Sequence, residues 1–138
     1  MIELTDEMKS AFANALSDGS PVLVGTAGKA GMPDMAYKGS FMVYDQEHLA
    51  FWERAHGTTL QNMTENPQVC VFYRNPQTRT AWKMFGVAEL HPDGPTRQSI
   101  MDQTIEIELS RDPDRKGIGV MIRVDKVVAL GKVIMERE

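Results

Sequence analysis

The chain has 138 residues, a formal net charge of −4 and a single cysteine. This length predicts one domain over residues 1–138, with a core that needs no disulfide or metal to hold it together. One cysteine excludes an internal disulfide and a multi-cysteine zinc site. The acidic balance argues against nucleic acid as a partner, because most nucleic-acid affinity comes from basic residues that neutralise phosphates.

The distribution of apolar residues also argues against a membrane protein. The longest apolar runs cover only a few residues, as at 69–73, whereas a membrane-spanning helix needs about 20. The first residues contain no basic stretch followed by an apolar one, so we expect no secretory signal. These features predict a cytoplasmic protein with no membrane partner.

The N-terminal third of the chain predicts one helix followed by short strands. Apolar residues recur with helical spacing over 5–18, with Thr5 as the N-cap and Gly19 as the stop signal. The strands are predicted at 21–27, 33–37, 41–44 and 48–53. The gaps between these strands are of hairpin length and contain turn-forming residues, which favours antiparallel pairing.

The strand at 48–53 has apolar residues on both of its faces. Because side chains alternate along a strand, Leu49 and Phe51 should face one side and Ala50 and Trp52 the other.

A short helix is predicted directly after this strand, over 57–66. Thr58 and Gln61 have the Thr-x-x-Gln spacing of a capping box at its start. The Asn66-Pro67 step ends the helix, because a residue before proline avoids helical backbone angles.

The remaining elements complete a mainly β chain with peripheral helices. Strands are predicted at 68–73, 80–91 and 119–130, and a helix at 95–109. About seven short strands joined by turns indicate an antiparallel sheet closed into a barrel. Strands do not alternate with long crossover helices, so a Rossmann-type sheet is not expected.

The segment between residues 38 and 66 contains the best candidate for a binding site. The N-terminus of the short helix offers unpaired backbone N–H groups, which favour an anion. Hydroxyls at Thr58 and Thr59 and cations at Lys38 and Arg54 could complete a phosphate site, with Trp52 against a flat ring. The alternative interpretation is structural, with Thr58 as a simple cap, Arg54 in solvent and Trp52 in the core.

No metal site or catalytic triad is indicated by spacing. The three histidines, His48, His56 and His91, lie in different predicted elements without the spacing of metal ligands. We therefore expect no bound metal.

Short words of this segment resemble a known family. Residues 33–40 (PDMAYKGS), 49–54 (LAFWER) and 57–69, together with the strand at 81–90, look like the small flavin-binding split-barrel proteins. These are the pyridoxamine 5'-phosphate oxidase-like proteins, and the resemblance covers roughly residues 10–130.

The resemblance implies a six- to seven-stranded antiparallel split β-barrel that forms a homodimer, with flavin mononucleotide (FMN) in clefts at the subunit interface. Carried over by position, the implied cofactor-binding residues are Lys38, Ser40, Trp52, Glu53, Arg54, Thr58, Thr59, Asn62, Ala81 and Trp82. Of these, Ala81 and Trp82 match a strand that approaches the flavin from the partner subunit. Aromatic residues that look exposed in the sequence, namely Tyr37, Tyr73 and Trp82, agree with a surface that a second subunit covers.

Two departures from the family pattern affect the cofactor and the substrate. Many relatives carry a basic residue at the position of Thr58, and the oxidase that names the family carries basic residues at both Thr58 and Thr59. Losing a charged donor to phosphate removes roughly 1.5–3 kcal/mol of binding free energy, so deazaflavin and haem are alternative ligands. The sequence at 130–138 has no basic, histidine-containing segment, so we expect an enzyme other than a pyridoxamine phosphate oxidase.

The function implied by the resemblance is flavin redox chemistry on a small molecule. In such an enzyme the flavin ring performs the redox step, and the protein orients the ring and shapes the substrate pocket. The alternative is a flavin, deazaflavin or haem binding protein without turnover of its own. A small barrel that binds nucleic acid or a protein is a third hypothesis, disfavoured for nucleic acid by the acidic charge.

Overall fold

A computed structural model describes all 138 residues. The elements are α1 (Asp6–Asn14), β1 (Leu23–Ala27), β2 (Pro33–Tyr37), β3 (Met42–Val43), β4 (His48–Glu53), α2 (Thr58–Glu65), β5 (Gln68–Asn75), β6 (Thr80–His91), α3 (Gly94–Gln103), α4 (Glu106–Leu109), β7 (Ile118–Ala129) and β8 (Lys132–Glu136). All eight strands join one antiparallel sheet in the order β2-β1-β5-β6-β7-β4-β3, with β8 paired to β7.

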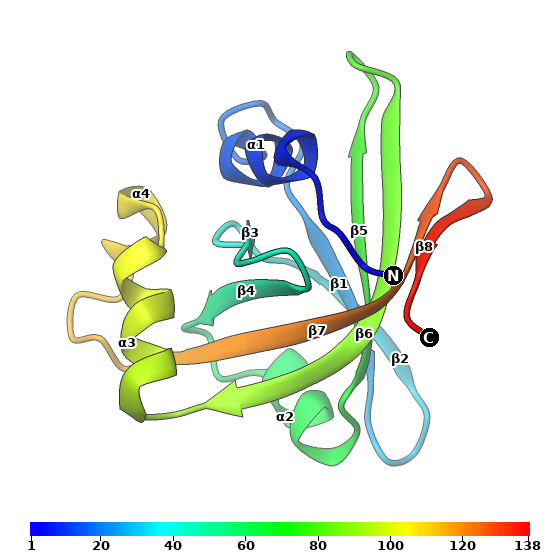
Figure 1. Cartoon of the computed structure of the whole chain (residues 1–138). Helices are drawn as coiled ribbons and strands as arrows, with labels where there is room; N and C mark the ends of the chain where they lie inside the picture. Colours follow the sequence, from blue (N-terminus) through cyan, green and yellow to red (C-terminus); the bar gives the residue numbers. More distant parts are fainter.

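The sheet curls around a core but does not close (Figure 1). Strands β2 and β3 stand at the two ends of the sheet order and do not pair with each other. Helix α1 lies beside the long β5–β6 hairpin, whereas α2 lies against β1 and β2, and α3 against β7 and β4 (Figure 1). The predicted mainly β split barrel is therefore confirmed, with one strand more than the upper predicted number.

The main core lies between α1 and the inner face of the sheet. Phe12 of α1 stacks on Tyr73 of β5, with ring centroids 5.8 Å apart, and meets Phe41 edge-on. Tyr73 in turn stacks on Trp82 of β6, with ring centroids 5.3 Å apart. Burial of this aromatic series is the main apolar link between the N-terminal helix and the sheet.

Strand β4 is covered on both faces, and its side chains alternate as its sequence predicts. Leu49 and Phe51 belong to the main core, while Ala50 and Trp52 pack with Ile100 of α3 in a second, smaller cluster. Both faces are sealed because β4 runs between the barrel interior and α3. This strand carries much of the candidate site described below.

Two predicted helices differ from the observed ones. Thr5 caps α1 as predicted, accepting the Met8 N–H at 3.1 Å, but the helix ends at Asn14 rather than at residue 18. The helix predicted at 95–109 is wrong, because extended backbone at Thr104 and Ile105 divides it into α3 and α4. At this break the Thr104 hydroxyl donates to the Ile100 carbonyl at 2.8 Å, which satisfies one helix-end acceptor.

The last predicted strand, at 119–130, is confirmed as β7, and a hairpin turn follows it. Leu130 and Gly131 both have positive φ, 51° and 82°, which fits the two central residues of a tight hairpin turn. Leucine rarely adopts such a conformation, so the sequence carried no strong signal for this turn. Strand β8 follows it and was missed.

The prediction of exposed aromatic residues is correct only for Tyr37, which is 66% exposed. Tyr73 and Trp82 are buried in the core of their own chain, at 2% and 6% exposure. Alternation explains the error, because Tyr73 and Trp82 are paired across β5 and β6 and point to the inner face together.

No helix in the structure is long and apolar enough to cross a membrane. No group of three or more histidine, cysteine or acidic side chains gathers as metal ligands would. The predicted cytoplasmic location stays a prediction.

Candidate functional site

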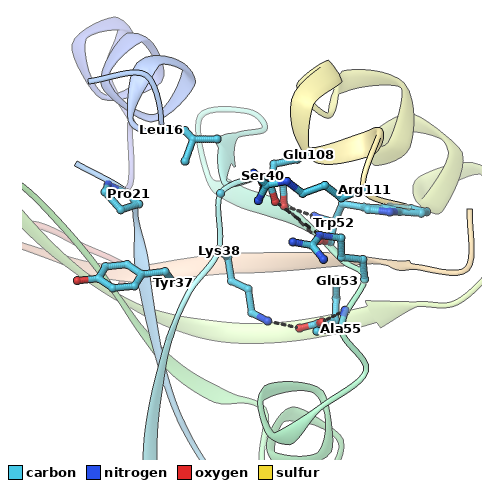
Figure 2. A pocket seen from close by; sticks show the side chains of 12 residues that line it. Leu16, Pro21, Tyr37, Lys38, Ser40, Trp52, Glu53, Ala55, Glu108 and Arg111 are labelled. Carbon is cyan, nitrogen blue, oxygen red and sulfur yellow. Dashed lines mark hydrogen bonds and ion pairs between the residues drawn. The ribbon is translucent and has the colours of Figure 1, made fainter. Parts of the chain in front are cut away.

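A cavity of about 310 Å³ lies beside the end of β4, between the segment that follows β2 and helix α4. Half of the ten predicted cofactor residues line it, namely Lys38, Ser40, Trp52, Glu53 and Arg54. Figure 2 shows the Lys38 and Glu53 side chains pointing toward each other from opposite sides of this cavity. The structure therefore brings together the residues that the sequence placed on two separate segments.

The centre of the cavity is a buried ion pair. The Lys38 Nζ lies 2.9 Å from Glu53 Oε1, with side chains that are 13% and 0% exposed (Figure 2). Glu53 Oε2 accepts the backbone N–H groups of Ala55, at 2.9 Å, and His56, at 3.3 Å. Glu53 Oε1 accepts no hydrogen bond and is held by the Lys38 ammonium alone as an ion pair. One oxygen of this carboxylate thus keeps capacity for a further donor.

Ser40 holds the two walls of the cavity together. The Trp52 N–H donates to Ser40 Oγ at 2.9 Å, and Ser40 Oγ donates to the Trp52 carbonyl at 3.1 Å. Both partners are buried, so these bonds are shielded from water. Ser40 therefore fixes the segment carrying Lys38 to the strand carrying Glu53.

The opposite rim of the cavity is formed by Glu108 of α4. Arg111 Nη1 donates to Glu108 Oε2 at 3.3 Å, and Arg54 Nε lies 3.9 Å from Glu108 Oε1. A Cβ atom at Gly39 would lie 2.8 Å from the Glu108 carboxylate, so only glycine allows this approach. Arg54 is held loosely, and its side chain is 37% exposed.

Trp52 is fixed by groups behind the cavity. Its indole N–H donates to Asp112 Oδ2 at 2.9 Å, and the Arg97 guanidinium lies 4.8 Å from the centre of its ring. Burial raises the pKa of the Asp112 carboxyl, but hydrogen bonds from the Lys116 and Gly117 N–H groups and from Trp52 outweigh it and hold the pKa below its usual value. Trp52 is consequently a rigid wall.

Helix α2 begins three residues after Ala55, but neither Thr58 nor Thr59 lines the cavity, and the first turn of the helix has no side-chain cap. Gly57 is the N-cap, so the capping box predicted for Thr58 and Gln61 is wrong. A capping box needs the hydroxyl residue outside the helix, whereas Thr58 is already its first residue. The first-turn N–H groups are left free of intrahelical partners, with Thr58 exposed and Thr59 buried.

Asn62 lies away from this first turn. Its amide Nδ2 donates to Thr26 Oγ1 at 3.0 Å, which ties α2 to β1. A Cβ at Gly28 would lie 2.9 Å from Asn62 Oδ1, so the β1–β2 turn is packed against the same side chain. Asn62 therefore acts here as a link between elements.

Ala81 and Trp82 do not meet the cavity within one chain. They lie at the start of β6, and neither is among the residues that line the cavity. Trp82 points into the core, whereas Ala81 lies on the outer face of the sheet, paired with Arg74. A contact between these two residues and the cavity would need a second copy of the chain.

Four residues around the site were not found from the sequence. Glu108 lies on α4, Arg111 and Asp112 lie in the loop after it, and Arg97 lies on α3. The Glu108–Arg111 spacing of three residues is the one local signal that they belong together. Nothing local indicates that they reach β4, which is more than 40 residues away in the sequence.

The curled open sheet and the charged cavity at the end of β4 define a split β-barrel protein. The family model described as pyridoxamine 5'-phosphate oxidase matches residues 7–125. The chain therefore belongs to the pyridoxamine 5'-phosphate oxidase family. A search of curated protein sequences gives no match.

Solved structures with low sequence identity share the fold. A Lactobacillus delbrueckii protein assigned to pyridoxamine 5'-phosphate oxidase superposes with a TM-score of 0.73 at 23% identity, over 91% of this chain and 93% of that one. The haem storage protein HutZ from Vibrio cholerae has a TM-score of 0.70 at 16% identity, over 92% and 94%. An FMN-binding protein from Syntrophomonas wolfei has a TM-score of 0.63 at 11% identity, over 91% and 90%.

Proposed function

We propose that this protein is a flavin-dependent oxidoreductase that holds FMN with the phosphate at the N-terminus of α2. The observation that supports the proposal is the uncapped first turn of α2, which begins four residues after the loosely held, cavity-lining Arg54 in a chain that belongs to this family. An anion at this point meets free N–H groups and the positive end of the helix dipole.

The donors around α2 fit a phosphate without the basic residues that many relatives have. Thr58 is exposed at the first turn and offers a hydroxyl, and Arg54 offers a guanidinium that only a 3.9 Å contact to Glu108 restrains. Lys38 differs, because Glu53 already neutralises it. Phosphate binding in this proposal therefore relies on neutral donors and Arg54.

When bound, the flavin ring supplies the redox chemistry. The chain's residues orient the ligand and exclude water around it. Trp52 gives a wall held by Asp112 and Arg97, and the Lys38–Glu53 pair offers polar atoms at the base of the cavity. We propose a small substrate other than pyridoxamine 5'-phosphate, because the C-terminal Arg137 is held by contacts away from the cavity, with Asp125 and Glu47.

We further propose a homodimer with the cofactor at its interface. The outer face of the sheet presents Tyr37, Leu23 and Phe72 side by side across β2, β1 and β5, and Met35 next to them is 73% exposed. Exposed apolar area of this kind is costly in water, which favours a covering partner. Ala81 lies on this face and Trp82 does not, so Ala81 is the residue that would approach the partner's cavity.

Haem is the weaker candidate ligand for the cavity. An iron centre in such a site takes a protein ligand, most often histidine. None of the three histidines lines the cavity, and each has a partner: His48 with Asp45, His56 with the Lys116 carbonyl and His91 with Glu89.

The first test is reconstitution of the purified protein with FMN, desalting and a visible absorption spectrum. The wild-type protein should retain FMN, and Arg54→Ala should lose most of it. Arg79→Ala, an exposed arginine in the β5–β6 turn, is the matched control and should retain FMN. Equal retention by Arg54→Ala and the control would reject the phosphate site. Parallel titrations with a deazaflavin and with haem compare the alternative ligands.

Two further measurements address turnover and assembly. Reduction of the bound flavin by a nicotinamide donor, followed by reoxidation with a substrate, distinguishes an enzyme from a carrier. Sedimentation should give a dimer that Tyr37→Glu weakens, whereas Ile107→Glu, at an exposed apolar residue on α4, should not. A monomeric wild-type protein would remove the interface from the proposal.

A further inference from the structure

A second cavity, of about 480 Å³, lies between α1 and the β5–β6 hairpin and shares no residue with the first. Its floor is aromatic, made by Tyr73 and Trp82, whose rings stack at 24° with centroids 5.3 Å apart. Cavities of this size are typical of small-molecule sites. The proposed FMN site makes no use of it.

The floor of this cavity presents hydrogen-bond donors that the chain does not use. The Trp52 indole N–H donates to Asp112, but the Trp82 N–H makes no hydrogen bond within the chain, although the residue is only 6% exposed. Trp82 is not among the side chains whose unpaired polar atoms are sealed from solvent, so its N–H is open at the cavity that its ring lines. The Tyr73 hydroxyl accepts a 3.3 Å bond from Asn75 and donates to no group.

The charge around this cavity is entirely negative. Glu7 of α1 and Asp18 after α1 line it, and no lysine, arginine or histidine does. Neither carboxylate takes part in an ion pair. The other lining groups are neutral hydroxyls, amides and one alanine. An anion is disfavoured at such a site, and a cation is attracted.

We propose that this cavity binds a small organic cation that carries a hydroxyl group, as amino alcohols and their quaternary derivatives do. The carboxylates of Glu7 and Asp18 attract the cationic group and balance its charge. The hydroxyl oxygen of the ligand accepts the free N–H of Trp82. This inference does not depend on the proposed FMN site.

The test uses choline as the probe and the two indole N–H signals of the ¹⁵N-labelled protein as the readout, since the chain has two tryptophans. Choline should shift the Trp82 signal and leave the Trp52 signal in place. The uncharged isostere 3,3-dimethylbutan-1-ol should bind at least about five-fold more weakly, because it keeps the shape and loses the charge that Glu7 and Asp18 attract. Trp82→Phe assigns the signals.

A matched pair of variants tests the role of charge. Glu7→Gln should weaken choline binding about three-fold, as expected for one exposed charge. Asp6→Asn changes the same charge in the same helical turn, but Asp6 does not line the cavity, and this variant should bind as the wild type does. Both residues are exposed, so neither change should unfold the protein.

Three results would overturn the proposal: an unmoved Trp82 signal at saturating choline, equal binding of choline and its uncharged isostere, or equal effects of Glu7→Gln and Asp6→Asn. The opposite results support it. If Trp82→Phe does not fold, the comparison of choline with its isostere identifies the indole signal that responds to charge. Glu7→Gln is then tested with that signal.

Discussion

Two buried carboxylates flank Trp52, and they are held in opposite ways. Asp112 accepts three N–H groups, from Trp52, Lys116 and Gly117, at 2.8–2.9 Å. Glu53 accepts two backbone N–H groups on one oxygen, while its other oxygen has only the Lys38 ammonium. Asp112 is therefore saturated with donors, and Glu53 is not.

The difference separates a structural carboxylate from a candidate functional one. A carboxylate with its donors supplied by backbone and indole N–H groups fixes a loop and has little left to offer a ligand. A buried carboxylate that is balanced by one lysine depends on that ion pair. Any ligand that competes for the lysine will change the strength of the pair. Both carboxylates lie next to Trp52, Glu53 along the chain and Asp112 at its side chain. Only the pattern of hydrogen-bond donors distinguishes them.

The largest expected effect follows loss of the Lys38 charge. Lys38→Met leaves Glu53 buried without its counter-charge and should lower the free energy of unfolding by about 3 kcal/mol. Lys29→Met, at an exposed lysine in the β1–β2 turn, is the control and should change it by less than about 0.5 kcal/mol. Urea unfolding measures both. Equal stability of the two variants would mean that the Lys38–Glu53 pair is not an effective interaction.

The second prediction addresses Asp112. Asp112→Asn keeps the size of the side chain but replaces one of its acceptor oxygens with a donor, so it should lower the unfolding free energy by about 2 kcal/mol. Asp114→Asn, at an exposed residue of the same loop, should leave stability unchanged. A similar loss in both variants would place the effect in the charge of the loop rather than in the hydrogen bonds to Asp112.

The third prediction contrasts the two carboxylates in ligand binding. Glu53→Gln releases Lys38 from its ion pair and keeps an oxygen for the Ala55 N–H, so FMN should bind about ten-fold more tightly. Asp112→Asn should bind FMN as the wild type does under conditions where both are folded. Calorimetric titration gives both dissociation constants. Weaker binding by Glu53→Gln would show that the carboxylate itself contacts the cofactor.

The smallest effect is on the pH dependence of stability. The pKa of Asp112 is lowered in the folded state, so its contribution is present above the unfolded pKa of about 4 and is lost as the pH falls through the folded pKa. Asp112→Asn should therefore flatten the fall of stability below about pH 4. The pH dependence of stability in Asp112→Asn is compared with that in Glu53→Gln. Thermal unfolding from pH 6 to pH 2.5 measures the slopes, and an unchanged slope in Asp112→Asn would contradict the assignment.

Much of the fold was predictable because its signals are local. Alternation along 48–53 predicted which side chains of β4 share a face, and the strand–turn pattern predicted the antiparallel sheet. The errors lie where one residue departs from its usual preference. Thr104 leaves the helical conformation inside an apparently continuous helix, and Leu130 adopts positive φ in a hairpin turn.

The candidate site was predictable in part as a set of residues but not as a set of contacts. Lys38 and Arg54 were identified as cations near one helix terminus, and both line the cavity. The sequence does not show that Glu53 neutralises Lys38. The two residues belong to separate segments, which meet only because of the way the chain folds between β2 and β4. The formal charges counted from a sequence therefore differ from the net charge that a ligand meets at the site.

The sequence by itself determined seven of the eight strands and the absence of a disulfide, since these depend on residue type and short-range spacing. Only the tertiary structure decided which carboxylates and cations meet. Helix α4 and its following loop bring Glu108, Arg111 and Asp112 to β4, and α1 meets the β5–β6 hairpin over Tyr73 and Trp82. These contacts come from packing between distant segments, whose energies no local pattern contains.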